Sequence, residues 1–428
     1  MNLVRTLLKL PITGIQGLIT LGLSLLFILN VRLYTPSPPL ASGEMSPEIW
    51  AELRYLRHAI DEGAADDMQK LFPEGNFFMQ ILYGLAWVNV GLQSAPDSPE
   101  RAQALTEARW VWEALESPAA SAPFFRSPSL SPEGGIFYSG WRNYLLAGIL
   151  LLQVPTQQDA EELAIFQAEC EAIAQAIKDN PTPFLQAYAG QSWPVDTFPA
   201  VVSLRAHTQL VDDRYEPVID RWLDSLSDYL DPNTTLLPHQ VHPQTGHQLE
   251  GTRATSQVLI LRFLYELDPE LGMTHYKLFR ENHTAYLWGF PGILEYPDNV
   301  RGYGDVDSGP LLQGVSLSAT TVMLGTSQMY GDAELSNALW HAGEVLGMPI
   351  RYAGMKRYWF GLLPVGDAFV VWSKTSTPWL VPISQPAYQS IIPEWWRLLL
   401  NCVSLGLAVL AILAIILVRI PMRYSHKP

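Results

Sequence analysis

The sequence predicts a mainly α-helical protein, in which an (α/α)6-type toroid with short β-hairpins lies between two membrane-spanning helices. An uncharged apolar segment lies near each end of the chain. Between these segments, helical patterns follow one another and are separated by loops rich in proline and glycine. With 48% hydrophobic residues in 428, the chain can form a large folded core.

The net charge and the cysteine content exclude several classes of protein. The chain has 27 Lys+Arg against 42 Asp+Glu and a formal net charge of −15, whereas nucleic-acid binding requires a basic surface. Its two cysteines, Cys170 and Cys402, are too few for a disulfide scaffold or a cysteine-based metal site. Three loop histidines, at 239, 242 and 247, have no accompanying cysteine or tight carboxylate. We therefore expect no nucleic-acid partner, no metal and no cofactor.

The two apolar segments are each long enough to cross a lipid bilayer. Residues 10–31 and 398–418 contain no charged side chain. At about 1.5 Å per residue, a helix of either length spans roughly 30 Å. The first segment is longer than the apolar core of most signal peptides, which favours an uncleaved anchor over a cleaved signal. Tyr34, Trp395 and Trp396 are placed as interfacial anchors.

The distribution of charge predicts the orientation of the chain. All 42 acidic residues lie between residues 33 and 396, and basic residues flank the outer side of each apolar segment. The positive-inside rule then puts both termini in the cytoplasm and the central domain outside it, at the cell membrane. The predicted parts are a cytoplasmic N-terminus (1–9), a transmembrane helix (10–31), a linker (32–45), an extracytoplasmic toroid domain (46–392), a second transmembrane helix (398–418) and a cytoplasmic tail (419–428).

The central domain begins with a helix over 47–71, because Ser46 and Pro47 form a typical N-cap and first turn before apolar residues at helical spacing. Similar patterns between turn signals predict further helices over 76–93, 98–116, 137–153, 158–179, 197–211, 215–230, 253–267, 270–283, 310–330 and 332–346. Residues 286–296 and 358–372 are aromatic and β-branched around glycines, and we expect hairpin strands there. Successive helical hairpins favour a ring of inner helices, with a cleft formed by loops at one end.

The most distinctive loop joins several polar side chains to a helix of small residues, expected over 311–324. It holds Glu295, Tyr303, Asp305 and Asp307. Such a polar loop beside a closely packing helix suggests groups held in a cleft. Alternatively, Asp305 caps a turn and Asp307-Ser308 caps the helix, with Pro310 in its first turn.

Three other helix starts carry candidate side chains. Trp193 and Asp196 pair a stacking surface with a carboxylate, although Asp196 can instead be a helix N-cap. Trp141 and Arg142 open another helix, where Trp141 can equally be a core residue. Arg253 begins a third, and an inward arginine there would orient a carboxylate or bind an anionic ligand.

The order of these motifs along the chain is distinctive. The motifs are Trp-Arg-Asn-Tyr at 141–144, Trp-Pro-Val-Asp at 193–196, Gly-Thr-Arg-Ala-Thr-Ser at 251–256, Glu-Tyr-Pro at 295–297 and Asp-Val-Asp-Ser-Gly-Pro at 305–310. This order resembles a family of membrane-anchored bacterial (α/α) toroid proteins. That family is similar in fold to the six-hairpin glycosidases and to the linalool dehydratase/isomerase-like proteins.

The resemblance to six-hairpin glycosidases implies a pair of carboxylates across a sugar-binding cleft, one acting as acid and one as base through water. It makes Asp196, Asp305 and Asp307 the candidate catalytic residues, and we expect Asp196 and Asp307 to face the same cleft. The candidate substrate-binding residues are Trp141, Arg142, Trp193, Arg253, Glu295 and Tyr303.

The resemblance to the dehydratase group implies chemistry on a small apolar alcohol, in a pocket that involves a cysteine. Cys170 lies in a helix rich in carboxylates, which disfavour the reactive thiolate. Three functions therefore remain open. They are an enzyme acting on an envelope or extracellular glycan, a dehydratase or isomerase of an apolar alcohol, and a non-catalytic envelope binding or assembly protein.

Overall fold

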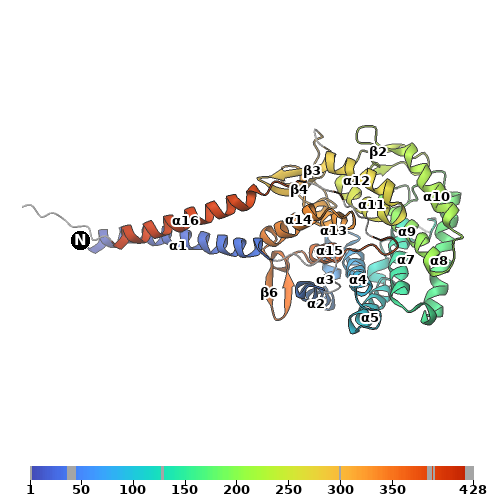
Figure 1. Cartoon of the computed structure of the whole chain (residues 1–428), viewed down its shortest axis with the longest axis horizontal. Coiled ribbons are helices and arrows are strands. Elements are labelled where there is room, and N and C mark those ends of the chain that lie inside the picture. The colour runs from blue at the N-terminus through green and yellow to red at the C-terminus, as the bar shows by residue number, and fades with distance from the viewer. Residues whose placement is uncertain are drawn as a thin grey trace, which may run out of the picture.

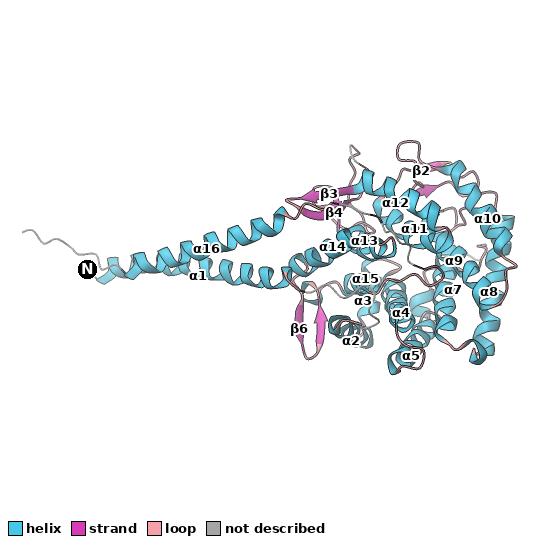
Figure 2. Ribbon diagram, in the orientation of Figure 1, coloured by secondary structure: helices cyan, strands magenta, loops and turns pink. Residues whose placement is uncertain are grey.

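Helices make up most of the chain, and short β-hairpins lie between some of them (Figure 2). The computed structural model describes residues 2–35, 45–126, 130–297, 300–382, 388 and 391–419. Most of the expected linker (32–45) and nearly all of the expected tail (419–428) lie outside these residues.

In the described part of the chain, six helices form a closed inner ring. They are α4 (Gly75–Gln93), α7 (Gly135–Leu152), α9 (Pro194–Leu210), α11 (Ala254–Leu267), α13 (Leu317–Met329) and α15 (Pro364–Lys374). Each of these helices contacts the next along the chain, and α15 contacts α4, so the ring closes. In Figure 1 their labels lie in the middle of the domain, with those of the outer helices around them.

The outer helices alternate with the inner ones along the chain. They are α2 (Pro47–Asp61) with α3 (Ala64–Leu71), α5 (Pro99–Ala114), α8 (Ala160–Asp179), α10 (Glu216–Ser225), α12 (Pro269–His283) and α14 (Ala333–Leu346). Because every inner helix follows an outer one, the inner helices all enter the ring from the same end. The arrangement confirms the expected fold class, an (α/α)6-type toroid with short β-hairpins.

The helix starts differ between the two layers. Ser46, Ser98 and Asp268 cap outer helices by accepting hydrogen bonds from backbone N–H groups of the first turn. Among the inner helices, α4, α7, α9, α11 and α15 begin without a side-chain cap in the described structure, and Ser316 caps α13. The end of the ring where the inner helices begin is therefore rich in uncapped helix N-termini, which favour negative charge.

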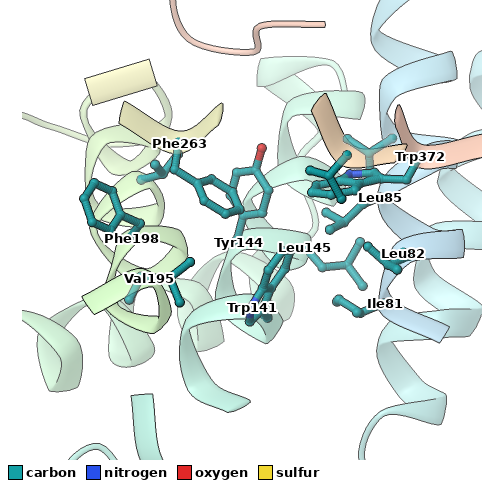
Figure 3. Close-up of a cluster of buried hydrophobic side chains, with 14 of the residues drawn as sticks. Ile81, Leu82, Leu85, Trp141, Tyr144, Leu145, Val195, Phe198, Phe263 and Trp372 are labelled. Carbon is teal, nitrogen blue, oxygen red and sulfur yellow. The ribbon is translucent and has the colours of Figure 1, made fainter. Parts of the chain in front are cut away.

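Aromatic and aliphatic side chains fill the interior of the ring (Figure 3). The Trp141 ring lies 5.3 Å from that of Phe263 and 5.9 Å from that of Trp372. At the end where the inner helices finish, the Trp379 ring stacks on that of Tyr144 at 4.2 Å. The Glu266 carboxylate accepts a hydrogen bond from the backbone N–H of Trp379 at 2.7 Å. The chain segment after α15 thus covers this end, which leaves the opposite end for a site.

The short elements lie in the connections. They are α6 (Pro118–Ser121), the 3₁₀ turns η1 (Pro155–Gln157), η2 (Leu226–Tyr229) and η3 (Trp359–Gly361), and the strands β1 (Gln240–Val241), β2 (Gln248–Glu250), β3 (Thr284–Leu287), β4 (Phe290–Leu294), β5 (Val315–Ser316), β6 (Ile350–Tyr352) and β7 (Met355–Arg357). All strand pairs are antiparallel, in the order β1-β2, β3-β4-β5 and β6-β7.

Three sequence-based expectations differ from the structure. The hairpin over 286–296 is confirmed as β3–β4, but the hairpin over 358–372 is wrong, because Pro364 starts α15 and its apolar residues pack in the ring. The helix over 47–71 is divided at Gly63, whose φ of 89° breaks the helical path. The helix expected over 311–324 begins only at Leu317, because the residues just before it pair with β4 as β5.

The two terminal helices, α1 (Asn2–Leu33) and α16 (Trp395–Arg419), lie side by side and extend away from the ring as a stalk (Figure 1). Both contain a segment long and apolar enough to cross a membrane, Gly14–Leu33 and Trp395–Ile416. Leu33, Val345 and Trp396 form a small buried cluster where the stalk meets α14. The expectation that Trp396 is an interfacial anchor is therefore wrong, because this side chain is 0% exposed in the junction.

A network of buried charges joins the first and last hairpins of the ring, and we call it the seam. Lys374 lies 2.7 Å from Glu52 and 2.9 Å from Glu344, and Lys356 lies 2.7 Å from Glu344. These four side chains are each at most 3% exposed. The Tyr358 hydroxyl donates to Glu52 at 3.0 Å. The seam thus connects α2 with α14, α15 and β7.

Removing one charge from the seam should destabilise the fold strongly. Lys374→Met leaves Glu52 and Glu344 with less compensating charge, and we expect the free energy of unfolding to fall by about 3–5 kcal/mol. Lys70→Met is the matched control, because Lys70 forms an ion pair with Asp67 at the surface, where it is 74% exposed. The control should change stability by less than about 1 kcal/mol. Equal losses for the two variants in denaturant titrations of the full chain in detergent would contradict this assignment.

The buried Asp367 predicts a specific dependence of stability on pH. Burial and the charge of Glu52 raise the pKa of Asp367 to about 8, although its carboxyl accepts the Tyr358 N–H. The folded state therefore binds a proton that the unfolded chain, with a carboxyl pKa near about 4, has lost, so stability falls as the pH rises from about 4 to about 8. Asp367→Asn keeps the acceptor and has no charge. Its melting temperature should fall less over this range than that of the wild type; parallel curves would show that Asp367 is ionised when folded.

Candidate functional site

Carboxylates from three separate segments meet at the end of the ring where the inner helices begin. Glu74 immediately precedes α4, Asp196 lies in the first turn of α9, and Asp307 lies in the loop between β4 and β5. Burial and the charges of Asp307 and Glu74 raise the pKa of Asp196 well above its ordinary value. The three groups are thus close enough for their charges to act on one another.

Asp196 and Asp307 are carboxyl groups without an ion-pair partner among the described residues. Among the described residues, no arginine, lysine or histidine forms an ion pair with either group, and no donor hydrogen-bonds to either carboxyl. Burial and the charges of Asp305 and Glu74 raise the pKa of Asp307 to about 6, although the positive charge of Arg253 opposes this rise. Asp196 is half-buried and Asp307 is exposed, so solvent reaches both residues.

The alternative roles considered for these two residues do not apply. Helix α9 begins at Pro194 with Trp193 at the N-cap position, so Asp196 is not the N-cap. The N-cap of α13 is Ser316, so Asp307-Ser308 does not cap this helix. Neither carboxyl group is therefore used by the backbone of the helix that follows it.

Asp305 has a different environment from its neighbour Asp307. It accepts hydrogen bonds from both terminal nitrogens of Arg253, with Nη2–Oδ1 at 2.8 Å, and from the backbone N–H groups of Asp307 and Ser308, each at 3.1 Å. Although burial opposes it, these bonds hold the pKa of Asp305 well below its ordinary value. Asp305 therefore caps a turn, one of the two roles considered for it, and this turn places Asp307.

Arg253 links this turn to the body of the domain. Its Nε donates to the buried Glu295 at 2.7 Å, and the Thr255 hydroxyl donates to the same oxygen at 2.6 Å. Arg253 and Glu295 are 3% and 0% exposed. Arg253, directly before α11, thus forms ion pairs with Glu295 and Asp305, the two ends of this segment.

Glu74 and Tyr188 are members of the site that the sequence analysis did not identify. The Tyr188 hydroxyl donates a hydrogen bond to Glu74. Burial and the charge of Glu74 raise the pKa of Tyr188, with smaller effects from Asp196 and Asp307. The Phe-Pro-Glu-Gly segment reads only as a turn. Glu74 lies at the start of an inner helix, as Asp196 does. This shared position identifies Glu74 as a candidate only after the outer and inner helices have been assigned.

The remaining predicted binding residues are dispersed. Trp141 is 2% exposed in the ring core, so its faces are not available for stacking on a ligand. Arg142 points to the outer layer, where it pairs with Glu169 at 3.0 Å and with Glu116. Trp193 is half-buried and makes an edge contact with Tyr188 at 6.1 Å. Tyr303, 94% exposed, lines a separate pocket of about 550 Å³.

Cys170 lies on α8 and is fully buried against α7 and α9. Asn143 donates to its sulfur at 3.3 Å. Burial raises the pKa of the Cys170 thiol to about 12. At neutral pH this cysteine is therefore not a nucleophile or an acid/base group.

Similar solved structures include two glycoside hydrolases of family 76. One is a GH76 α-mannanase from Bacteroides thetaiotaomicron, with 10% sequence identity and a TM-score of 0.43 over 69% of this chain and 84% of that chain. The other is a family 76 glycoside hydrolase from a bovine Bacteroides thetaiotaomicron strain, with 11% identity and a TM-score of 0.38 over 69% and 68%. No family model and no curated sequence matches the chain. Since both TM-scores are below 0.5, neither similarity bears on its activity.

Removal of the Glu74 charge should lower the pKa of both unpaired carboxyl groups. In Glu74→Gln, the midpoint of the carboxyl band that Asp307→Asn eliminates should fall below about 6, measured by infrared difference spectroscopy against pH. Glu100→Gln, an exposed residue of α5, is the control and should leave the midpoint unchanged. An unchanged midpoint in Glu74→Gln would mean that Glu74 does not act on Asp307.

Proposed function

We propose that this protein is a membrane-anchored enzyme of glycoside hydrolase type, acting on an envelope or extracellular glycan. The observation that supports it is the pair Asp196 and Asp307, two carboxyl groups without an ion-pair partner among the described residues, on separate segments at the end of the ring where the inner helices begin. Structural carboxylates are normally paired, as Asp305 is, so two unpaired ones whose charges act on each other suggest acid/base chemistry.

The pKa values suggest how the two roles divide. Burial and the charges of Asp307 and Glu74 raise the pKa of Asp196 well above its ordinary value, which favours its protonated form, so Asp196 is the proposed general acid. Asp307, with a pKa of about 6, is mostly ionised at pH 7 and is the proposed general base. No hydrogen bond joins the two among the described residues. This is compatible with a water molecule between them, as an inverting mechanism requires.

In this mechanism, Asp307 takes a proton from water while the water oxygen bonds to the anomeric carbon. The glycosidic C–O bond breaks, and the leaving oxygen takes the proton of Asp196. Asp305 and Arg253 act as positioning residues that hold the turn before Asp307. Trp193, half-buried at the start of the helix that carries Asp196, is the proposed stacking surface for a sugar ring.

Membrane anchoring is part of the same proposal. Leu21, Phe27 and Leu405 of the stalk are 67%, 70% and 68% exposed, and an apolar surface of this kind supports a lipid environment. The charge distribution along the chain favours a ring outside the cytoplasm with both termini inside.

The dehydratase alternative receives no support from the site, because Cys170 is buried and protonated away from the carboxylates. A non-catalytic binding protein remains the competing function. It gives no role to two carboxyl groups with raised pKa values, whereas a hydrolase of this type uses such a pair as acid and base.

The two roles can be separated by substitution. On unactivated oligosaccharides, Asp196→Asn and Asp307→Asn should each lower kcat by at least about a thousand-fold. On 2,4-dinitrophenyl glycosides, whose leaving group needs no proton, Asp196→Asn should regain most activity and Asp307→Asn should not. Sugar release by the full chain in detergent is the readout.

Asp213→Asn, an exposed residue before α10, is the matched control and should behave like the wild type. Equal recovery of both site variants on the activated substrate would contradict the assignment of roles. No hydrolysis by the wild type of any glycoside or envelope oligosaccharide tested would favour the binding protein.

A further inference from the structure

The β3–β4 hairpin packs its tip against the base of the stalk. A Cβ atom on Gly289 would lie 2.8 Å from the side chains of Trp395 and Trp396, so only glycine allows this approach. The Phe290 ring lies 4.5 Å from that of Trp396. The preceding residue, Trp288, is nevertheless 65% exposed. This hairpin therefore holds an exposed tryptophan beside the first turn of α16.

The second hairpin, β6–β7, lies on the other side of the stalk base (Figure 2). At the end of α1, Arg32 donates to the Pro349 carbonyl just before β6. The Trp359 N–H, just after β7, donates to the Gly347 carbonyl at 2.9 Å. Trp359 and Phe360 are 56% and 57% exposed. Exposed aromatic side chains thus flank the stalk base on two sides.

The backbone at these three aromatic residues is strained. Trp288, Trp359 and Phe360 have φ angles of 49°, 45° and 62°, in the left-handed region that bulky residues rarely adopt. The turn of β3–β4 is Trp-Gly with both residues left-handed, where asparagine or aspartate before glycine is the usual choice. Strain of this kind persists where it serves a function, and here it accompanies large apolar side chains held in solvent.

The stalk provides the reason to expect a lipid surface at this level. Leu33 and Trp396 are buried in the junction, and Leu398, within the first turn of α16, is already 66% exposed. Tyr34 and Trp395, at the ring-proximal ends of the stalk helices, are 61% and 48% exposed. A bilayer that covers the apolar stalk would therefore begin directly at the ring, and its interface would meet the flanking aromatic residues.

We propose that Trp288, Trp359 and Phe360 form a collar that inserts into the interfacial region of the lipid bilayer around the stalk. The inference rests on the proposed membrane anchoring, and it adds ring residues to the two helices as lipid contacts. Tryptophan combines an apolar ring with an N–H donor, which suits the boundary between acyl chains and headgroups. With contacts on both sides of the stalk, the ring cannot rotate freely above the membrane.

The collar also relates the candidate site to the bilayer. Strand β4 ends at Leu294, immediately before Glu295 and the loop that carries Asp307, and Phe360 precedes the start of α15 by only a few residues. Both collar segments are therefore continuous with the end of the ring where the carboxylates lie. The collar would hold this end close to the lipid headgroups, where it would meet the glycans nearest the membrane.

The test uses the full chain in phosphatidylcholine nanodiscs, with and without lipids brominated near the top of the acyl chains. Trp288→Phe and Trp359→Phe conserve aromatic bulk, and the difference from wild-type fluorescence isolates the emission of each tryptophan. We expect each to lose at least about half its intensity in brominated lipid and to resist iodide in the aqueous phase. Trp112, half-buried on α5, is the control and should show no lipid quenching.

Trp395→Phe separates this inference from the anchoring on which it depends. If brominated lipid quenches Trp395 but either Trp288 or Trp359 behaves like Trp112, the collar is wrong and the anchoring stands. That result would also be expected if a partner protein or a second copy of the chain covered these residues. If Trp395 is not quenched, the anchoring itself fails and the collar fails with it.

Discussion

The ring can close only where its first and last hairpins meet, and the buried charges of the seam hold them together there. Lys374 bonds to Glu52 at 2.7 Å and to Glu344 at 2.9 Å. Lys374 and Glu52 are more than three hundred positions apart in the chain. Between other neighbouring hairpins the connecting loop limits how far the helices can separate. At the seam no loop does so, and the loss of either partner of a buried ion pair there would leave an uncompensated charge. The seam thus ties α2 of the first hairpin to α14 and α15 of the last.

The candidate site depends on the same closure, because its members come from distant hairpins. Glu74 belongs to the first hairpin and Asp307 to the fifth, and only the closed ring brings them near Asp196. The site uses charge in the opposite way from the seam. The seam pairs carboxylates with lysines, and Arg253 pairs with Asp305 and Glu295, whereas Asp196 and Asp307 lack a cationic partner among the described residues. The paired groups fix the geometry, and the unpaired groups are the ones proposed to transfer protons.

Much of the architecture was predictable from local patterns. Helix starts such as Ser46-Pro47 follow from capping chemistry, and the alternation of helices and turns led to the toroid. The segment 358–372 shows the limit of this reasoning, because its aromatic and β-branched residues suit a strand as well as a buried helix. Its helical form as α15 follows from its place in the ring core, where Val371 and Trp372 are buried. The same limit applies to Trp396, whose burial depends on α14 and the β3–β4 hairpin.

The sequence by itself determined the helical class, the two apolar segments and the loops that carry Asp196 and Asp307, because each depends on residues close together in the chain. Only the tertiary structure decided which carboxylates have partners, that Trp141 lies in the core, and that Glu74 and Tyr188 join the candidate site. Burial and charge pairing are properties of the space around a side chain. In a closed ring that space is supplied by helices from every part of the chain, so no local pattern contains it.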